Sequence, residues 1–345
     1  TKFFAQNFER LKLKKLISTS FAPESKNIKS VYQPTLFEKA NPQFDDKKTI
    51  INGKIFTLKN DRTGDGKIDV NDLEWKYLKG DGDFRSEEIK KLRDEADVII
   101  TNPPFSLFRD FLAWIVEADK KFVIIGNMNA ITYKEVFPLI QNNKMWTGSR
   151  FNKRLNGKNM TFTVPDDYTL SGTEVEMSAE GKKMVSVAGT GWFTNIDHGI
   201  RHQFLPLMTM ADNIKFSKHK EVKGKEYQKY DNYDAIEIPF TDAIPSDYDG
   251  VMGVPISFLP KYNPEQFVIL GATQRGCHDN VPDTKKYDDY WEVKQNGEKT
   301  GSSGGKTNEN ANLEVNDGRK NYFINKEGHI VQSAYQRIFI KHKKW

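Results

Sequence analysis

The strongest constraint on the fold is an apolar run that ends in Asn-Pro-Pro-Phe and is followed at once by an amphipathic segment. Residues 98–101 have the apolar, β-branched character of a buried strand, and residues 102–105 are the Asn-Pro-Pro-Phe sequence. Two consecutive prolines restrict the backbone and keep the preceding residue extended. Residues 107–116 repeat apolar side chains at helical spacing, and residues 122–126 form a second apolar run. Strand, loop, helix and strand in this order predict a βαβ unit and a parallel sheet.

The Asn-Pro-Pro-Phe loop has the chemistry that activates an exocyclic amino group. The lone pair of such a nitrogen is delocalised into the ring of the base, so the nitrogen is a poor nucleophile until acceptors hold both of its N–H groups. The side-chain oxygen of Asn102 can accept from one N–H, and the main-chain carbonyl of Pro103 can accept from the other. Pro104 stiffens the loop, and Phe105 offers a face on which a flipped base can stack. The alternative is an ordinary proline turn at a strand end, with Asn102 as a turn residue.

A second loop, at residues 80–86, offers groups for an adenine-bearing cofactor. Doubly wound folds commonly hold such cofactors with a carboxylate that accepts from the adenine amino group and an apolar ring that covers the adenine face. Asp83 and Phe84 have these two chemistries, and Asp81 is a competing carboxylate. The alternative is a Gly-Asp turn that starts a helix over residues 86–96, in which a serine cap and two glutamates favour the first turn. Both interpretations can hold together.

These loops belong to a longer series of sequence blocks that resembles the EcoRI-type adenine-specific DNA methyltransferases. The blocks follow in one order over most of the chain and comprise residues 80–86, 101–107, 125–133, 192–199, 230–236 and 248–255. The resemblance implies S-adenosylmethionine as methyl donor and N6 of a flipped adenine in duplex DNA as acceptor. It also implies a place in restriction-modification, with a cognate restriction endonuclease that acts on the same DNA site without a stable complex.

Two other functions stay open at this point. A protein glutamine N-methyltransferase uses a similar Asn-Pro-Pro loop, because a carboxamide nitrogen needs the same two acceptors. A non-catalytic DNA-binding module would follow if the first strand of the methyltransferase sheet, which holds the methionine end of the cofactor, were absent. The chain opens at Thr1 inside an amphipathic segment that leads to a predicted strand at residues 15–19. The first strand is therefore expected to be missing at the N-terminus.

The expected fold is α/β, a Rossmann-like S-adenosylmethionine-dependent methyltransferase sheet with a β-rich target-recognition region. Residues 1–145 are predicted to form the catalytic and cofactor-binding domain, and residues 146–345 the target-recognition region. Part of the second region, about residues 185–210, is expected to return and complete the catalytic sheet with an antiparallel hairpin. Residues 293–312 contain scarcely an apolar side chain, which predicts a mobile loop.

Composition fits a cytoplasmic enzyme and permits a DNA partner. The 345 residues suffice for two domains, no apolar run approaches a membrane span, and a single cysteine, Cys277, suits a reducing compartment. The net charge of +5 is compatible with DNA binding. Lysines gather in residues 215–229, where Lys223 and Lys225 are predicted phosphate contacts and a solvated loop is the alternative. Arg201 is a third predicted DNA contact, to a phosphate or a guanine edge.

Residues 61–72 place oxygen ligands and a central glycine at the spacing of an EF-hand-like calcium loop. Asp72 stands where such a loop usually has a bidentate Glu, and residues 49–58 before it are predicted to be β-like rather than helical. Calcium binding and a plain acidic Gly-Asp turn both stay open. A structural or DNA-contacting role, rather than metal binding, is assigned to Asp197, His198 and His202. The sequence therefore assigns no metal site.

Overall fold

A computed structural model describes residues 1–22, 39, 42–148, 161–168, 175–186, 189–273, 281, 283–316 and 321–343. It divides into two units, Thr1–Asp97 with Trp114–Lys120 and Val98–Ala113 with Lys121–Trp345, and each is considered by itself. The predicted functional boundary near residue 145 is a different division and stays a prediction. Cys277 lies outside the described residues. Among the helices within these ranges, none is long and apolar enough to cross a membrane.

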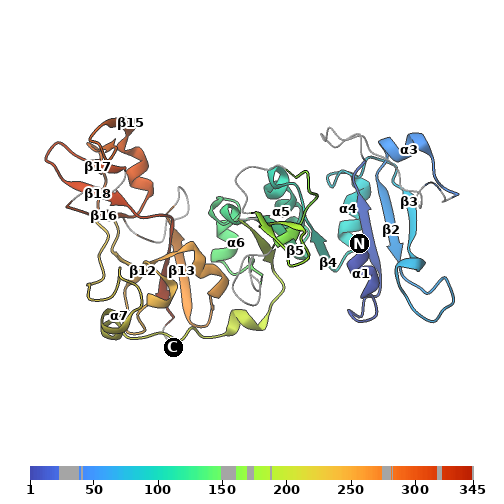
Figure 1. The fold of residues 1–345 in the computed structure, drawn as a ribbon, viewed down its shortest axis with the longest axis horizontal. Helices are drawn as coiled ribbons and strands as arrows, with labels where there is room; N and C mark the ends of the chain where they lie inside the picture. The colour runs from blue at the N-terminus through green and yellow to red at the C-terminus, as the bar shows by residue number, and fades with distance from the viewer. Residues whose placement is uncertain are drawn as a thin grey trace. The chain divides into compact units, whose positions relative to one another are not determined.

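The first unit contains an antiparallel sheet, drawn in blue in Figure 1. Its strands are β1 (Leu16–Ser20), β2 (Lys54–Leu58) and β3 (Glu74–Tyr77), in that spatial order. Helix α1 (Lys2–Gln6) precedes the sheet, and the buried Phe8 after it packs with Leu58 of β2. Apolar side chains on one face of the sheet therefore hold the N-terminal segment in place.

Helix α3 (Asp46–Ile51) overturns the β-like expectation for the start of residues 49–58. The carboxylate of Asp45 accepts hydrogen bonds from the main-chain N–H groups two and three residues later, which caps the helix. This cap outweighs the β preference of the branched residues that follow it, so β2 begins only at Lys54.

Helix α4 (Glu87–Glu95) confirms the helix predicted over residues 86–96. The hydroxyl of Ser86 accepts from the main-chain N–H of Ile89 at 3.4 Å, and two glutamates occupy the first turn. The second of these, Glu88, also accepts from the main-chain N–H of Lys79 at 2.9 Å. The start of the helix therefore fixes both ends of the loop between β3 and α4.

The predicted βαβ arrangement is confirmed. Strands β4 (Val98–Thr101) and β5 (Lys121–Asn127) pair in parallel, and helix α5 (Phe108–Glu117) connects them. Strand β10 (Thr190–Thr194) lies antiparallel to β5, and β6 (Trp146–Thr147) pairs antiparallel with β10. The order β4-β5-β10-β6 thus places one reversed strand between two strands of the same direction.

Helix α5 packs on this sheet through an aromatic contact that requires a glycine. Phe108 is buried, and its ring centroid lies 5.4 Å from that of Phe193 on β10. A Cβ atom at Gly126 of β5 would overlap the ring of Phe108. The absence of a side chain at this position therefore allows the helix to approach the strand closely.

Strand β4 is less buried than its apolar sequence predicts. Val98 is 41% exposed and Ile100 is 46% exposed. Within the described part of the chain, β4 pairs with β5 alone and so lies at the edge of its sheet. An edge position leaves apolar side chains accessible that a central strand would bury.

The rest of the second unit is mostly β structure. One sheet has the order β11-β12-β19-β13, with β11 (Ala235–Glu237) and β12 (Val251–Pro255) parallel, and β19 (Arg337–His342) antiparallel to β12 and β13 (Phe267–Ala272). Another has the order β15-β14-β17-β18-β16 and is drawn in red in Figure 1, with β14 (Trp291–Val293), β15 (Lys299–Ser303), β16 (Asn312–Glu314), β17 (Tyr322–Ile324) and β18 (Ile330–Ser333). The remaining elements include β7 (Thr161–Thr163), β8 (Val175–Met177), β9 (Lys183–Ser186), α6 (Phe137–Gln141) and α7 (Met210–Phe216). The architecture is therefore mixed α/β with several sheets.

Residues 293–312, predicted to be a loop, contain strand β15 and the 3₁₀ helix η7 (Gly304–Glu309). Side-chain amides take the place of apolar packing in this segment. Asn312 is fully buried, its Nδ2 donates to the carbonyl oxygen of Thr307, and its Oδ1 accepts from the hydroxyl of Ser333. Such buried hydrogen bonds supply order that apolar content does not predict. Mobility of the segment is a separate property and stays a prediction.

Candidate active site

The Asn-Pro-Pro-Phe loop lies directly after the carboxyl end of β4. Pro103 is buried, whereas Asn102 is exposed and Phe105 is 45% exposed. Within the described ranges, the Asn102 carboxamide has no hydrogen-bond partner. The 3₁₀ helix η2 (Phe105–Leu107) follows, and the N–H of Leu107 donates to the carbonyl oxygen of Pro104 at 2.9 Å. The loop therefore presents an unoccupied amide acceptor and an aromatic ring at the edge where open α/β sheets bind ligands.

The carboxyl end of the neighbouring strand β5 is also fixed by hydrogen bonds. The side-chain oxygen of Asn127 accepts from the main-chain N–H of Asn129 at 2.8 Å and caps the 3₁₀ helix η3 (Met128–Thr132). The N–H of Met128 donates to the carbonyl oxygen of Gly189, just before β10. These contacts give the sheet edge beside the Asn-Pro-Pro-Phe loop a defined shape.

In the first unit, the loop at residues 80–86 packs against the end of β1. The N–H of Ala22 donates to the carbonyl oxygen of Asp81 at 2.7 Å. Gly82 has φ of +88°, and a Cβ atom there would lie 2.7 Å from the carbonyl oxygen of Ser20. The left-handed backbone and the close approach both require glycine at this position.

Asp81 and Asp83 each use one carboxylate oxygen to shape this loop. Oδ1 of Asp81 accepts from the N–H of Asp83 at 3.0 Å, and Oδ1 of Asp83 accepts from the N–H of Arg85 at 2.8 Å. Oδ2 of Asp83 lies 3.9 Å from Nη1 of Arg85 and has no hydrogen bond within the residues that the structure describes. Each carboxylate thus keeps an oxygen for a ligand, so both residues remain candidates.

The ring of Phe84 contacts side chains that the sequence did not indicate. The ring of Trp114 meets it edge to face, with centroids 5.6 Å apart, and the guanidinium carbon of Arg85 lies 4.8 Å from its centroid. A cofactor ring that stacked on the face of Phe84 beside Arg85 would displace that guanidinium. The helical spacing of α5 could have indicated Trp114, because it extends the apolar stripe of that helix.

Arg201 is engaged within the protein. Its side chain is 10% exposed, its guanidinium carbon lies 4.0 Å from the centroid of the Trp146 ring, and its Nη2 donates to Oδ1 of Asn143 at 2.5 Å. These contacts hold the 3₁₀ helix η4 (Gly199–His202) against the segment around β6. In this conformation the guanidinium is not presented to DNA, and a DNA-contacting role for it stays a prediction.

Lys223 and Lys225 are exposed on the turn that follows α7. Val222 of the same turn is buried, and the ring of His219 stacks on Phe240 with centroids 3.7 Å apart. The turn is therefore anchored while its two lysines point to solvent. Their predicted phosphate contacts stay predictions.

His202 bridges two acidic side chains. Its Nε2 lies 2.8 Å from Oδ2 of Asp197, and its Nδ1 lies 2.9 Å from Oε1 of Glu265. The hydrogen bond with Asp197, and then that with Glu265, raises the pKa of the His202 imidazole above its ordinary value. The bridge links η4 to the segment before β13, which is a structural role.

The acidic loop at residues 61–72 uses its carboxylates as backbone acceptors. Asp61 accepts from the N–H groups of Gly64 and Gly66. Asp72 is 1% exposed and accepts from three main-chain N–H groups, led by that of Asp69, and these bonds lower its pKa to about 2. The loop thus has the internal bonding of an acidic Gly-Asp turn, and calcium binding stays a prediction.

Among the residues that the structure describes, Asp231, Glu314 and His329 form a group that could hold a metal ion, because their ligand atoms lie within 4.8 Å of one another. The ammonium nitrogen of Lys285 lies 3.0 Å from the Asp231 carboxylate, and Nδ1 of His329 lies 2.6 Å from the hydroxyl of Tyr290. A divalent cation would compete with an ammonium that already neutralises this carboxylate. We therefore treat the group as an ion-paired network.

Comparison with known proteins identifies the family. A family model described as adenine-specific methyltransferase EcoRI matches residues 1–343. The Type II methyltransferase M.EcoRI of Escherichia coli is 42% identical over 271 residues, which are 78% of this chain and 73% of the relative. The resemblance that the ordered sequence blocks indicate is therefore confirmed.

Two mycoplasma proteins are also similar. The Type II methyltransferase M.MgeORF184P of Mycoplasma genitalium is 34% identical over 270 residues, and M.MpnI of Mycoplasma pneumoniae is 30% identical over 270 residues. Each match covers 78% of this chain and 69% of the relative. No solved structure matches the chain. The chain belongs to the EcoRI family of adenine-specific DNA methyltransferases, which take their methyl group from S-adenosylmethionine.

Proposed function

We propose that this enzyme methylates N6 of a flipped adenine at a specific site in duplex DNA, as the modification component of a restriction-modification system. The observation that carries the proposal is the exposed Asn102 carboxamide, without a hydrogen-bond partner in the described ranges, at the carboxyl end of β4. The Type II methyltransferases among its relatives support the biological setting. A cytoplasmic location and a cognate endonuclease, which shares the DNA site without a stable complex, follow from that setting.

Within the mixed α/β architecture, we propose a Rossmann-like methyltransferase sheet with a β-rich target-recognition region. Two observations support it: the reversed strand β10 lies between β5 and β6, and the Asn-Pro-Pro-Phe loop follows a parallel strand. In this proposal residues 1–145 supply cofactor binding and catalysis. Residues 146–345 read the DNA, apart from β6 and β10, which belong to the catalytic sheet.

The acceptor loop would activate the amino group by hydrogen bonding. Oδ1 of Asn102 accepts from one N6–H of adenine, and the carbonyl oxygen of Pro103 accepts from the other. The two bonds draw N6 toward tetrahedral geometry and expose its lone pair, while Phe105 stacks on the flipped base. A carboxamide is not a base at neutral pH, so its contribution is electrostatic preorganisation, not proton removal. The prolines keep both acceptors aimed at one point.

The loop at residues 80–86 fits the adenine of S-adenosylmethionine. Asp83, with Asp81 as the competing carboxylate, offers an oxygen free of hydrogen bonds within the described ranges, and Phe84 offers an adjacent ring. When it is bound, S-adenosylmethionine supplies an electrophilic methyl group. The carboxylate would orient the cofactor by accepting from its amino group, and the ring would exclude water from the adenine face.

For DNA, we propose that Lys223 and Lys225 contact phosphates, because both are exposed on an anchored turn. Arg201 would then act indirectly, by holding η4 through Trp146 and Asn143. Phosphate contacts position the protein on the duplex without specifying its sequence.

The test is incubation with labelled S-adenosylmethionine and unmethylated bacterial DNA, followed by digestion of the DNA to nucleosides. We expect label in N6-methyldeoxyadenosine with the wild type and with Asn60→Ala, a change at an exposed asparagine elsewhere in the chain. Asn102→Ala should remove the label. Absence of label from DNA with the wild type would contradict the proposal. In that case a parallel incubation with protein in place of DNA would test the glutamine alternative.

A further inference from the structure

The connection between β18 and β19 presents an aromatic ring to solvent. Tyr335 lies in this turn and is 71% exposed, more than any other large hydrophobic side chain in the described part of the chain. Its hydroxyl has no hydrogen bond to another described residue. Packing within the protein therefore does not explain a tyrosine at this position.

A buried ion pair holds the turn that carries this ring. Nη1 of Arg337 donates to the carbonyl oxygens of Tyr335 at 2.8 Å and Gln336 at 3.3 Å. The rest of the guanidinium is bidentate to Glu237, with Nε 2.9 Å from Oε2 and Nη2 2.5 Å from Oε1. The two side chains are 11% and 9% exposed, and the hydroxyl of Tyr230 also donates to Glu237. The backbone of the exposed turn is thus tied to the interior of the second unit.

Main-chain contacts complete this support. The N–H of Ala334 donates to the carbonyl oxygen of Ala311 at 2.8 Å, before the tyrosine. After it, the N–H of Arg337 donates to the hydroxyl of Thr273 at 2.8 Å. A turn fixed on both sides presents its central side chain in a constant direction, which favours binding because little order is lost on contact.

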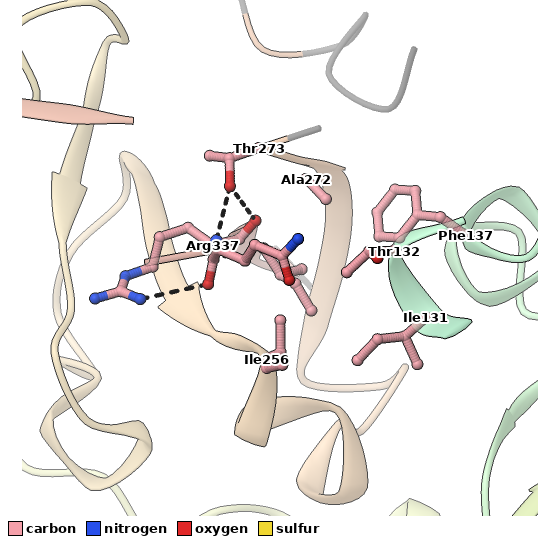
Figure 2. A pocket seen from close by; sticks show the side chains of 9 residues that line it. Ile131, Thr132, Phe137, Ile256, Ala272, Thr273 and Arg337 are labelled. Carbon is pink, nitrogen blue, oxygen red and sulfur yellow. Dashed lines mark hydrogen bonds between the residues drawn. The ribbon is translucent and has the colours of Figure 1, made fainter. Parts of the chain in front are cut away.

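The turn also lies next to the segment that follows β5. Figure 2 shows a small pocket with Ile131 and Thr132 of η3 on one side and Ala272 and Thr273 on the other, and Gln336 also lines it. Helix η3 begins at the carboxyl end of β5, and β5 runs parallel to β4, which leads into the Asn-Pro-Pro-Phe loop. The tyrosine turn therefore belongs to the carboxyl-end side of the sheet, as the acceptor loop does.

An enzyme that flips a base leaves a gap in the base stack and must offset the lost stacking. Proteins that distort DNA commonly insert an apolar or aromatic side chain between base steps for this purpose. Phe105 is already assigned to the flipped adenine. We infer that Tyr335 enters the duplex at the target site and stacks on the bases beside the vacated position. This inference rests on the proposed function, since only base flipping creates such a gap.

The test compares two synthetic duplexes that carry the recognised sequence, once that sequence has been mapped. In one duplex the target adenine is paired with thymine, and in the other it faces cytosine, so that flipping starts from a weakened pair. Single-turnover methylation is measured for the wild type, Tyr335→Ala and Tyr335→Phe. Phe3→Ala is the matched control, because Phe3 is an aromatic side chain that is 61% exposed on α1.

We expect Tyr335→Ala to slow methylation of the paired duplex by about tenfold or more, as loss of one aromatic stacking contact predicts. The mismatched duplex should restore most of that rate, while Tyr335→Phe and Phe3→Ala stay near the wild type. An unchanged rate with Tyr335→Ala on the paired duplex would overturn the inference, and so would an equal loss on both duplexes. If the wild type methylates neither duplex, the proposed function itself fails.

Discussion

At the scale of single residues, Asn102 has the clearest predicted effect. Asn102→Ala removes one of two acceptors for the amino group, which should lower kcat by about 100- to 1000-fold, the range found when one preorganised hydrogen-bonding group is deleted. The KM for S-adenosylmethionine should stay unchanged, because the loop at residues 80–86 is intact. Steady-state kinetics measure both constants. A large rise in that KM with an unchanged kcat would assign Asn102 to cofactor binding instead.

The two carboxylates of the cofactor loop can be separated by paired variants. Asp83→Ala should weaken binding of S-adenosylmethionine by about tenfold or more, because it deletes a charge-assisted hydrogen bond to the adenine amino group. Asp81→Ala is the matched control, since each carboxylate accepts one main-chain N–H in the loop. Equilibrium dialysis measures the Kd of each variant. If Asp81→Ala raised the Kd for S-adenosylmethionine more than Asp83→Ala does, Asp81 would be the carboxylate that binds the adenine amino group.

The sequence predicts residues whose chemistry is local and misses those defined by distant contacts. The acceptor roles proposed for Asn102 and Pro103 rest on a tetrapeptide and the strand before it, and they stay predictions. The burial of Arg201 depends on Trp146 and Asn143, which no spacing rule connects to it. Tyr335 was missed for a similar reason, because its exposure depends on how two strands are joined.

At the scale of elements, the contact between α5 and β5 should be sensitive to a small increase in volume. Gly126→Ala places a methyl group where the Phe108 ring lies, and overpacking of this kind destabilises a protein by about 1–3 kcal/mol. Urea denaturation measures the change in the free energy of unfolding. Gly80→Ala serves as the control, since a Cβ atom there would meet nothing within 4 Å. If both substitutions lowered the free energy of unfolding equally, the close contact between Gly126 and the Phe108 ring would be contradicted.

The bridge between η4 and the segment before β13 should depend on pH. The hydrogen bonds with Asp197 and Glu265 raise the pKa of His202, so they stabilise the folded state fully below the unfolded pKa of the imidazole. This contribution is lost as pH rises through the raised pKa of the folded state. The Tm difference between the wild type and His202→Gln should therefore be larger at about pH 5.5 than at about pH 8.5. A difference that grows with pH would contradict this assignment.

The sequence predicts elements whose cap residues and apolar periodicity indicate the same structure. It does not predict elements in which a cap and the β preference of branched residues conflict, or in which hydrogen bonds replace apolar packing. Helix α4 begins at Ser86, and the βαβ arrangement follows from apolar runs around the prolines. Helix α3 was missed because its Asp45 cap overrides the preference of branched residues. Strand β15 and η7 were missed because buried amide hydrogen bonds, including those of Asn312, supply their order.

At the scale of the whole molecule, the sequence blocks that resemble the family follow in one order over most of the chain. The family match over residues 1–343 includes the loop with Asp83 in the first unit and the loop with Asn102 in the second. We propose that the first loop holds the methyl donor and that the second activates the acceptor. The family match therefore covers both of the loops to which the sequence assigns a role.

The proposed activity is methylation of adenine N6 at one specific DNA site. The most direct measurement incubates unmethylated bacterial genomic DNA with the protein and S-adenosylmethionine, and then maps N6-methyladenine by long-read sequencing. We expect methylation at nearly every copy of one short sequence and none above background elsewhere, with no signal from Asn102→Ala. Absence of N6-methyladenine above a control without enzyme, or methylation spread over adenines without a shared sequence, would contradict it.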